Sequence, residues 1–404
     1  MNVLLPGLGG LVAGLLLGML LQSWRGSRGG GNGSLVPAAD NLPSQLGNRY
    51  FRGINYLLNE QPDKALEVFL QLADVTPDTV DTHLALGNLF RRRGEMDNAI
   101  RCHQNIIQNP DLSEKTRQAA TLELGEDYLR AGLLDRAEEL FTSLADQKIL
   151  TSVALQRLLE IFQQEKEWQH AIQVARQHEK ISGQSNRRLI AHFYCQLAEE
   201  NRAENNLQAA MKWLDQAEQS DRQCARISIM RAEMSAEQEH HEEVIRHYQQ
   251  ALRLDADSFP LLIDQLIDAY RHTGSEAQAL EFLQRWLQQH SNTSAVIHLL
   301  ALCEQLDRLD LLAEVLDDQM RQHPTVGKMH ALLRLRASTG SSSSRDIASE
   351  DISDLLQPLL EKLLQRRDGY QCRNCGLAGQ THHWHCPSCR QWDSTEPVSG
   401  SLGE

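Results

Sequence analysis

The sequence predicts an all-α protein built from a repeated pair of helices, and three observations support this prediction. Glycine and proline, the residues that interrupt helices, number only 25 and 11 among 404 residues, and aromatic residues make up 5%, fewer than a β-sandwich needs. A small residue recurs every 34 to 39 positions along most of the chain. Apolar residues follow a helical spacing on both sides of short turns. Because a chain of this length exceeds a single hydrophobic core, we expect several distinct parts.

The composition excludes some classes of protein. The formal net charge is −14, so the chain is not suited to coat nucleic acid, and no nucleic-acid partner is expected. Hydrophobic residues make up 41% of the sequence, which supports a folded body. Four of the eight cysteines are scattered singly, as is typical of free thiols in a reducing compartment.

An apolar run at residues 3–21 predicts a transmembrane helix. It carries no charged side chain, and at about 1.5 Å per residue it spans about 28 Å, close to the thickness of a bilayer core. The alternative is a cleavable signal peptide, which requires a basic residue before the run and small residues at a cleavage site after it. Only uncharged residues precede this run, whereas Arg25 and Arg28 follow it. Positive flanks stay in the cytoplasm, so we expect an uncleaved anchor over residues 1–22 and a cytoplasmic body.

The recurring small residue marks a repeat of about 34 positions. It is found at Ala65, Ala99, Ala137, Ala171, Ala210, Val244, Ala279 and Ala313. In the second unit, Gly87 and Phe90 lie on the first helix and Ala99 lies on the second, where closely crossing helices leave no room for a larger side chain. The arginines at 91–93 are interpreted as a solvated turn, with a ligand-facing edge as the alternative.

This arrangement of Leu-Gly, an aromatic residue, Ala and Pro resembles the tetratricopeptide repeat. The resemblance implies a superhelical solenoid of about eight repeats over residues 46–337, with a concave face that binds peptides or protein domains. The array shows no set of catalytic residues, so an enzyme is not expected. The histidines of the 240–247 segment do not match the His-Glu-x-x-His zinc motif and are interpreted as a solvated helix surface.

Four shorter segments complete the predicted organisation. Residues 23–45 are rich in glycine, serine and asparagine, as is typical of a flexible neck. A serine-rich stretch at 338–350 predicts a mobile loop, and leucines at helical spacing over 351–367 predict a connecting helix. Residues 396–404 are expected to form a tail.

The remaining four cysteines predict a metal site in a module at residues 368–395. Cys372, Cys375, Cys386 and Cys389 form two Cys-x-x-Cys pairs separated by ten residues, a spacing that gives a tetrahedral all-sulfur site for one zinc or one iron ion. Histidines at 382, 383 and 385 lie between the pairs and are interpreted as surface or supporting groups, with substitution as ligands the alternative. Four protein ligands leave no open position for a substrate, so the site is structural or, with iron, redox-responsive.

The module resembles rubredoxin, which shares the Cys-x-x-Cys-Gly motif at 372–376 and the Cys-Pro-x-Cys motif at 386–389. Arg390 stands where the second motif would have glycine. Tyr370, Trp384 and Trp392 are expected to form the small core, with the two tryptophans presenting a surface to a partner. We also expect the module to shape or close the end of the solenoid.

The order of anchor, neck, repeats and four-cysteine module is similar to that of the lipopolysaccharide assembly protein LapB (YciM) family of Gram-negative bacteria. The resemblance implies a single-pass inner-membrane adaptor with a periplasmic N-terminus and an iron ion at the four cysteines. It further implies that the adaptor promotes degradation of the deacetylase LpxC by the protease FtsH and gathers other lipopolysaccharide proteins. The alternatives are a generic membrane-tethered co-chaperone or assembly scaffold, and a redox protein using iron at the four cysteines. The sequence leaves open whether the metal is zinc or iron, and whether the chain associates into a homo-oligomer.

Overall fold

The computed structural model describes residues 79–339 and 369–400, together with isolated positions between 52 and 68 and residue 360. The chain divides into two compact units, residues 1–85 and 86–404, and the features below belong to the second, apart from the first residues of α4. The helices are α4 (Val80–Arg93), α5 (Met96–Ile107), α6 (Glu114–Ala131), α7 (Leu134–Asp146), α8 (Thr151–Glu165), α9 (Trp168–Ser182), α10 (Arg187–Ala203), α11 (Leu207–Ser220), α12 (Ala225–Glu237), α13 (His241–Leu254), the short 3₁₀ helix η1 (Ala256–Ser258), α14 (Phe259–His272), α15 (Glu276–Gln289), α16 (Thr293–Gln305), α17 (Asp310–Gln322) and α18 (Val326–Thr339).

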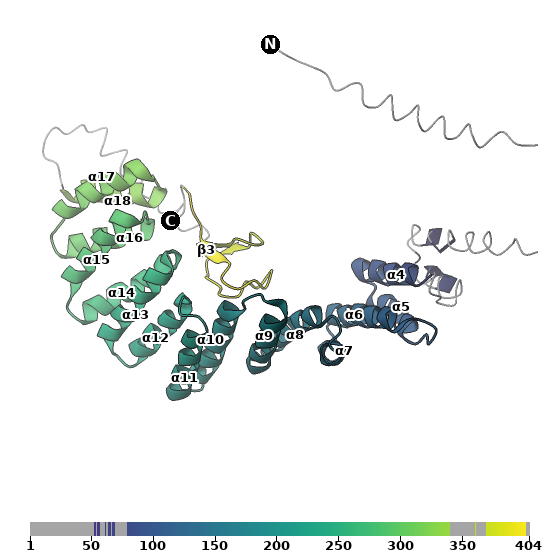
Figure 1. The fold of residues 1–404 in the computed structure, drawn as a ribbon. Helices are drawn as coiled ribbons and strands as arrows, with labels where there is room; N and C mark the ends of the chain where they lie inside the picture. Colours follow the sequence, from purple (N-terminus) through teal and green to yellow (C-terminus); the bar gives the residue numbers. More distant parts are fainter. Residues whose placement is uncertain are drawn as a thin grey trace, which may run out of the picture. The chain divides into compact units, whose positions relative to one another are not determined.

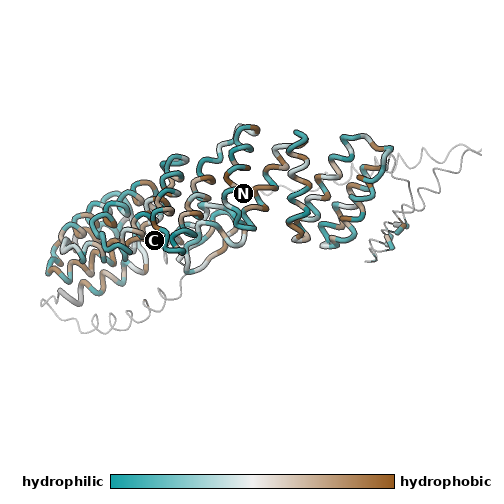
Figure 2. Tube along the Cα trace, turned by 90° about the horizontal axis from the view of Figure 1, so that it is seen from below, coloured by the Kyte–Doolittle hydropathy of each residue, from teal (hydrophilic) through white to brown (hydrophobic). Residues whose placement is uncertain are grey.

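Consecutive helices pack as pairs, and each pair packs on the next (Figure 1). The series from α4 to α18, called the array below, confirms the predicted helical repeat. Apolar and polar residues alternate along each helix in Figure 2, so each helix turns one side toward its neighbours and the other toward solvent.

The small residues that defined the period lie in the second helix of each pair. Those at 99, 137, 171, 210 and 279 have no exposed surface, and Val244 is 2% exposed. The helices also approach closely at Gly87, where an added Cβ would lie 2.4 Å from Nε2 of His103. The small residues therefore recur at each repeat because paired helices cross closely there, as the sequence predicted.

Two of the turns between helices contain glycine in a left-handed conformation. Gly132 ends α6 with φ of 75°, and Gly274 follows α14 with φ of 63°. Side chains adopt such angles at a cost, so glycine is favoured at both places.

The interpretation of residues 91–93 as a solvated turn is wrong for Arg91. All three arginines belong to the last turn of α4, and the Arg91 guanidinium donates to Glu123 at 2.5 Å and to Asp127 at 2.9 Å. The other Asp127 oxygen lies 2.5 Å from Nδ1 of the fully buried His103. Arg91 thus links α4 to α6 through a buried polar network instead of facing solvent.

Two hydrophobic clusters form the interior of the array. The first, called the first core, extends from Leu124 to Met234, and the second core extends from Ile229 to Leu335. The two cores meet at α12, which contributes side chains to both.

The C-terminal four-cysteine module contains the three strands of the described residues. They are β1 (Tyr370–Cys372), β2 (Ala378–Gly379) and β3 (Thr395–Pro397), in the antiparallel order β2-β1-β3. Tyr370 is opposite Gly379 on one side and Pro397 on the other. This small sheet holds the first cysteine at the end of its central strand.

Several predicted segments lie outside the described residues. These are the anchor at 1–22, the neck at 23–45, nearly all of the connecting helix at 351–367 and the last residues of the tail. Helix α18 ends at Thr339, two residues into the segment predicted as a loop at 338–350, and the rest of that segment is not described. Among the helices that the structure describes, none combines the length and the apolar character needed to cross a membrane.

Candidate metal centre and its docking on the array

The first pair of cysteines lies in a tight turn that begins at the end of β1. The Gly376 amide donates to the Cys372 carbonyl at 2.9 Å, and the Cys372 amide donates to the Leu377 carbonyl at 2.8 Å. Gly376 has φ of 76°, a conformation that favours glycine. The turn brings Cys375 back beside Cys372.

The second pair repeats this turn with a different residue at its end. The Arg390 amide donates to the Cys386 carbonyl at 2.9 Å, and the Cys386 amide donates to the Gln391 carbonyl at 3.0 Å. Arg390 has φ of 57°, the left-handed conformation that Gly376 adopts in the first turn. An L-residue in this conformation costs about 1 kcal/mol, and the rest of the turn holds Arg390 there.

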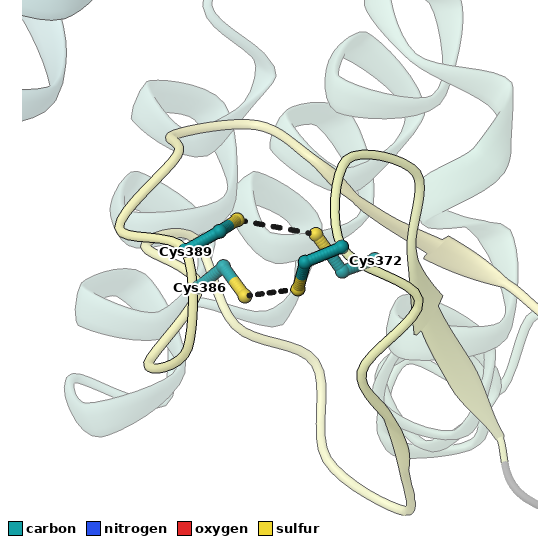
Figure 3. A group of neighbouring side chains, drawn as sticks. Cys372, Cys386 and Cys389 are labelled. Carbon is teal, nitrogen blue, oxygen red and sulfur yellow. Dashed lines mark hydrogen bonds between the residues drawn. The ribbon is translucent and has the colours of Figure 1, made fainter. Parts of the chain in front are cut away.

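The four sulfur atoms converge on one point between the two turns (Figure 3). All of them lie within 4.8 Å of one another, and the Cys372–Cys389 and Cys375–Cys386 sulfur pairs are each 3.7 Å apart. A tetrahedral ion with metal–sulfur bonds of about 2.3 Å would place its ligands about 3.8 Å apart. The arrangement therefore fits one tetrahedral metal ion, and no other group of three or more potential ligands occurs in the described part of the chain.

The pKa values of two of these cysteines are shifted in opposite directions. The hydrogen bond between Cys372 Sγ and the Ser394 hydroxyl, 3.3 Å long, lowers the pKa of Cys372 to about 6, with help from the Cys375 and Asn374 amides. Backbone hydrogen bonds from Cys389 lower the pKa of Cys386, but burial and the side-chain contacts with Cys389 and Cys372 outweigh them and raise it to about 11. Metal ligation requires thiolates. Cys372 and Cys386 are buried whereas Cys375 is exposed, so the cluster has one solvent-facing edge.

The three histidines between the pairs do not join the sulfur cluster. His382 packs edge-on against Trp384 with ring centres 4.5 Å apart, and burial lowers the pKa of its imidazole to about 4. His385 donates from Nε2 to the Arg390 carbonyl at 2.9 Å and stacks on Trp392. His383 is exposed. Their interpretation as surface or supporting groups agrees with these contacts.

Trp392 attaches the module to the first core of the array. Its indole Nε1 donates to the Gln163 side-chain oxygen of α8 at 2.8 Å. Its ring stacks on His192 of α10 at 5.1 Å and meets Phe193 and Trp168 edge-on at 5.8 and 6.2 Å. Aromatic contacts of this kind add about 0.5–1.5 kcal/mol each beyond the burial of surface.

Asp393 adds an ion pair beside this aromatic contact. Its carboxylate accepts a hydrogen bond from Nε of Arg188 at 2.6 Å and lies 2.9 Å from Nε2 of the fully buried His192. Burial by itself raises the pKa of Asp393, but the hydrogen bonds and charges of His192 and Arg188 outweigh it and lower the pKa to about 2.

Trp384 forms a third attachment. The Arg226 guanidinium of α12 lies over its ring at 5.8 Å, and the ring packs against the second core. Strand β3 also contacts η1. The expectation that Trp384 and Trp392 present a surface to a partner is therefore wrong, because both rings dock the module on its own array. The module contacts α8, α10 and α12, in the middle of the array and not at the end where it was expected.

Comparison with known proteins identifies both parts of the chain. Residues 370–397 match the rubredoxin metal binding domain, and residues 82–114 match a tetratricopeptide repeat. The chain is 34% identical to lipopolysaccharide assembly protein B of Escherichia coli strain K12 over 360 residues, which cover 89% of this chain and 92% of that protein. The chain belongs to the lipopolysaccharide assembly protein B family. The Haemophilus influenzae member is 28% identical over the same shares of the two chains.

Among solved structures, a tetratricopeptide repeat protein from Parabacteroides merdae is 13% identical and covers 70% of this chain and 99% of its own, with a TM-score of 0.32.

Of the docking residues, the sequence indicated only Trp384 and Trp392, and it assigned both to a partner surface. Arg188 and Asp393 are separated by 205 positions, and no local spacing relates them. Docking itself was expected, at the end of the solenoid. The signal for it is the two tryptophans that separate or follow the cysteines, since so small a module cannot bury both rings itself.

Proposed function

We propose that this chain is an inner-membrane adaptor that serves lipopolysaccharide assembly and acts by holding protein partners beside the membrane. The observation that carries the proposal is the 34% identity to the Escherichia coli protein over 89% of the chain, which is more than the array alone occupies. A repeat array with a docked four-cysteine module offers binding surfaces and no catalytic set of residues among those described, so the proposed role is non-catalytic.

The proposed organisation has its anchor at residues 1–22, followed by the flexible neck at 23–45. About eight repeats over 46–337 then form the cytoplasmic body, and the loop at 338–350 and the helix at 351–367 connect it to the module at 368–395. The apolar run at 3–21 and the basic flank after it support this topology, with the N-terminus in the periplasm.

The proposed ligands of a single metal ion are Cys372, Cys375, Cys386 and Cys389. The sulfur distances of 3.7 Å support this assignment. A bound iron or zinc ion would supply the cross-link between the two turns of a module too small to fold on apolar burial alone. The resemblance favours iron, whereas the sulfur ligands accept either metal.

The proposed partners are the protease FtsH and its substrate LpxC, as the family resemblance implies. The test measures the half-life of LpxC in cells that contain the full chain, a chain lacking residues 1–24, or a chain whose residues 1–24 are replaced by an unrelated transmembrane helix. We expect rapid LpxC turnover with the full chain, loss of most of it after deletion, and partial recovery with the foreign helix.

Two results would contradict this proposal. Full activity of the chain lacking residues 1–24 would show that the anchor has no role. Unchanged LpxC turnover in the absence of the chain, combined with crosslinking to other membrane proteins, would favour the generic scaffold instead.

A further inference from the structure

A groove of about 840 Å³ lies where the four-cysteine module meets the array. One wall is α8 and the start of α10, and the other is the second cysteine turn with the residues that follow it. Cys386 and Cys389 are among the lining residues, so an occupant would touch the array and the candidate metal centre at the same time.

The α8 wall is a single helical stripe of mostly amide side chains. Gln156, Leu159, Glu160, Gln163 and Gln164 line the groove, at the spacing that places residues on one face of a helix. Gln163 is held by Trp392, whereas Gln156 and Gln164 are exposed. From the first to the last of these residues the helix rises about 12 Å, which matches about four residues of an extended peptide.

The charges around the groove largely cancel. Arg188 is paired with Asp393, and Glu160 is paired with Arg157. The exposed Arg390 is the remaining one of the arginine and acidic residues in the lining, so two arginines balance two carboxylates. A groove without a strong net charge selects its ligand by hydrogen bonding and shape more than by ionic attraction.

We propose that this groove binds an extended peptide segment without net charge, whose main chain is read by the amides of Gln156, Gln164 and Gln391. Glutamine offers both a donor and an acceptor, as each peptide unit does. Because the wall opposite α8 is the second cysteine turn, the groove exists only while the module is docked. The inference rests on the proposed adaptor function in one respect, because the peptide segment belongs to a protein partner.

The experiment measures binding of peptides selected from a random 12-residue phage library on the metal-loaded full chain in detergent. Fluorescent copies of the selected peptides are titrated against the chain and against two variants, Gln164→Trp, which fills the groove, and Gln391→Ala. Gln169→Trp is the control, because Gln169 is exposed on α9 and does not line the groove.

We expect at least a tenfold loss of affinity with Gln164→Trp, a smaller loss with Gln391→Ala and no change with Gln169→Trp. Peptides N-methylated at two or more main-chain amides should bind at least tenfold more weakly, and raising the salt from 50 to 500 mM should change affinity less than about threefold.

The inference is overturned if no peptide is selected, if Gln164→Trp and Gln169→Trp have equal effects, or if binding depends strongly on salt. It is also overturned if anionic vesicles compete for the groove more effectively than the peptides do. These measurements concern peptide binding alone, so they can fail while the role in LpxC turnover stands.

Discussion

At the scale of single residues, Asp393 connects the chemistry of the module to that of the array. Its pKa is lowered to about 2 from a usual value of 3.8, and a shift of this size corresponds to about 2 kcal/mol in favour of the docked, ionised state. Because the pKa is lowered on docking, this contribution is complete above about pH 4 and is lost as the pH falls from about 4 to about 2.

We therefore expect Asp393→Asn to weaken docking by about 2 kcal/mol at neutral pH. Hydrogen exchange of the amides at 384–398 measures the effect, which should be a faster exchange of this segment. Asp268→Asn is the control, since Asp268 forms an exposed pair with Arg271 and such pairs contribute little. Equal exchange in the two variants would show that the ion pair does not hold the module.

Gly87 tests the close helix crossing that underlies the repeat. An added Cβ would lie 2.4 Å from a His103 ring atom, and this ring cannot move freely because it is buried and bonded to Asp127. Gly87→Ala should cost about 1–3 kcal/mol of unfolding free energy, measured by urea denaturation. The double variant Gly87→Ala/His103→Ala should lose less unfolding free energy than the two single variants lose together. A loss equal to that sum would contradict the predicted clash.

The sequence predicted those residues whose partners are set by local spacing. The small residue of each repeat and the four cysteines were found because helix periodicity and the Cys-x-x-Cys turn act over a few positions. Arg91 was misinterpreted because its acidic partners lie 32 and 36 positions later, in the next repeat. Arg157 and the preceding Glu126 are 31 positions apart, as are Arg202 and the later Glu233, so opposite charges about one repeat apart are a usable signal in such arrays.

At the scale of elements, the module and the array should respond separately to loss of a cysteine. Each single Cys→Ser change at 372, 375, 386 or 389 should remove the bound metal and unfold residues 368–395, because metal binding and folding share one free energy in so small a module. The array has its own cores and should keep its helical circular dichroism. Elemental analysis should give one metal per chain before the change and none after it.

The control for this prediction is Cys303→Ser, at a buried cysteine of α16 far from the module in sequence. It should leave the metal content at one per chain. Retention of metal by any of the four module variants would show that the remaining three sulfurs suffice.

Trp392 separates docking of the module from its folding. Trp392→Ala removes the contacts with Gln163, His192 and the rings of the first core. Because Trp392 is partly buried, the cost should be below the roughly 3–5 kcal/mol of a fully buried tryptophan. The four sulfurs are unchanged, so the metal content should stay at one per chain while exchange of the α10 amides accelerates. Loss of the metal together with docking would mean that Trp392 belongs to the core of the module itself.

At the scale of the whole molecule, the order of parts was predictable but the place where the module docks was not. Composition and repeats define the array, and the cysteine pairs define the module, because each is a property of neighbouring residues. Where the module docks depends on matching surfaces formed by α8, α10 and α12 and by residues more than 150 positions later. A single sequence contains no periodic signal for such a match.

The module also bridges the two cores, since Trp392 packs against the first and Trp384 against the second. Repeat arrays are held together mainly by nearest-neighbour contacts, so a bridge of this kind should make distant repeats unfold together. Removal of the metal by a chelator should then reduce the urea m-value and broaden or split the unfolding transition.

Metal-loaded Trp392→Ala should behave in the same way. The control is Trp213→Ala, which removes a ring stacked on Tyr194 of the array itself. It should lower the urea midpoint without splitting the transition. A sharp single transition of unchanged m-value in the metal-free chain would show that the cores are coupled through α12 alone.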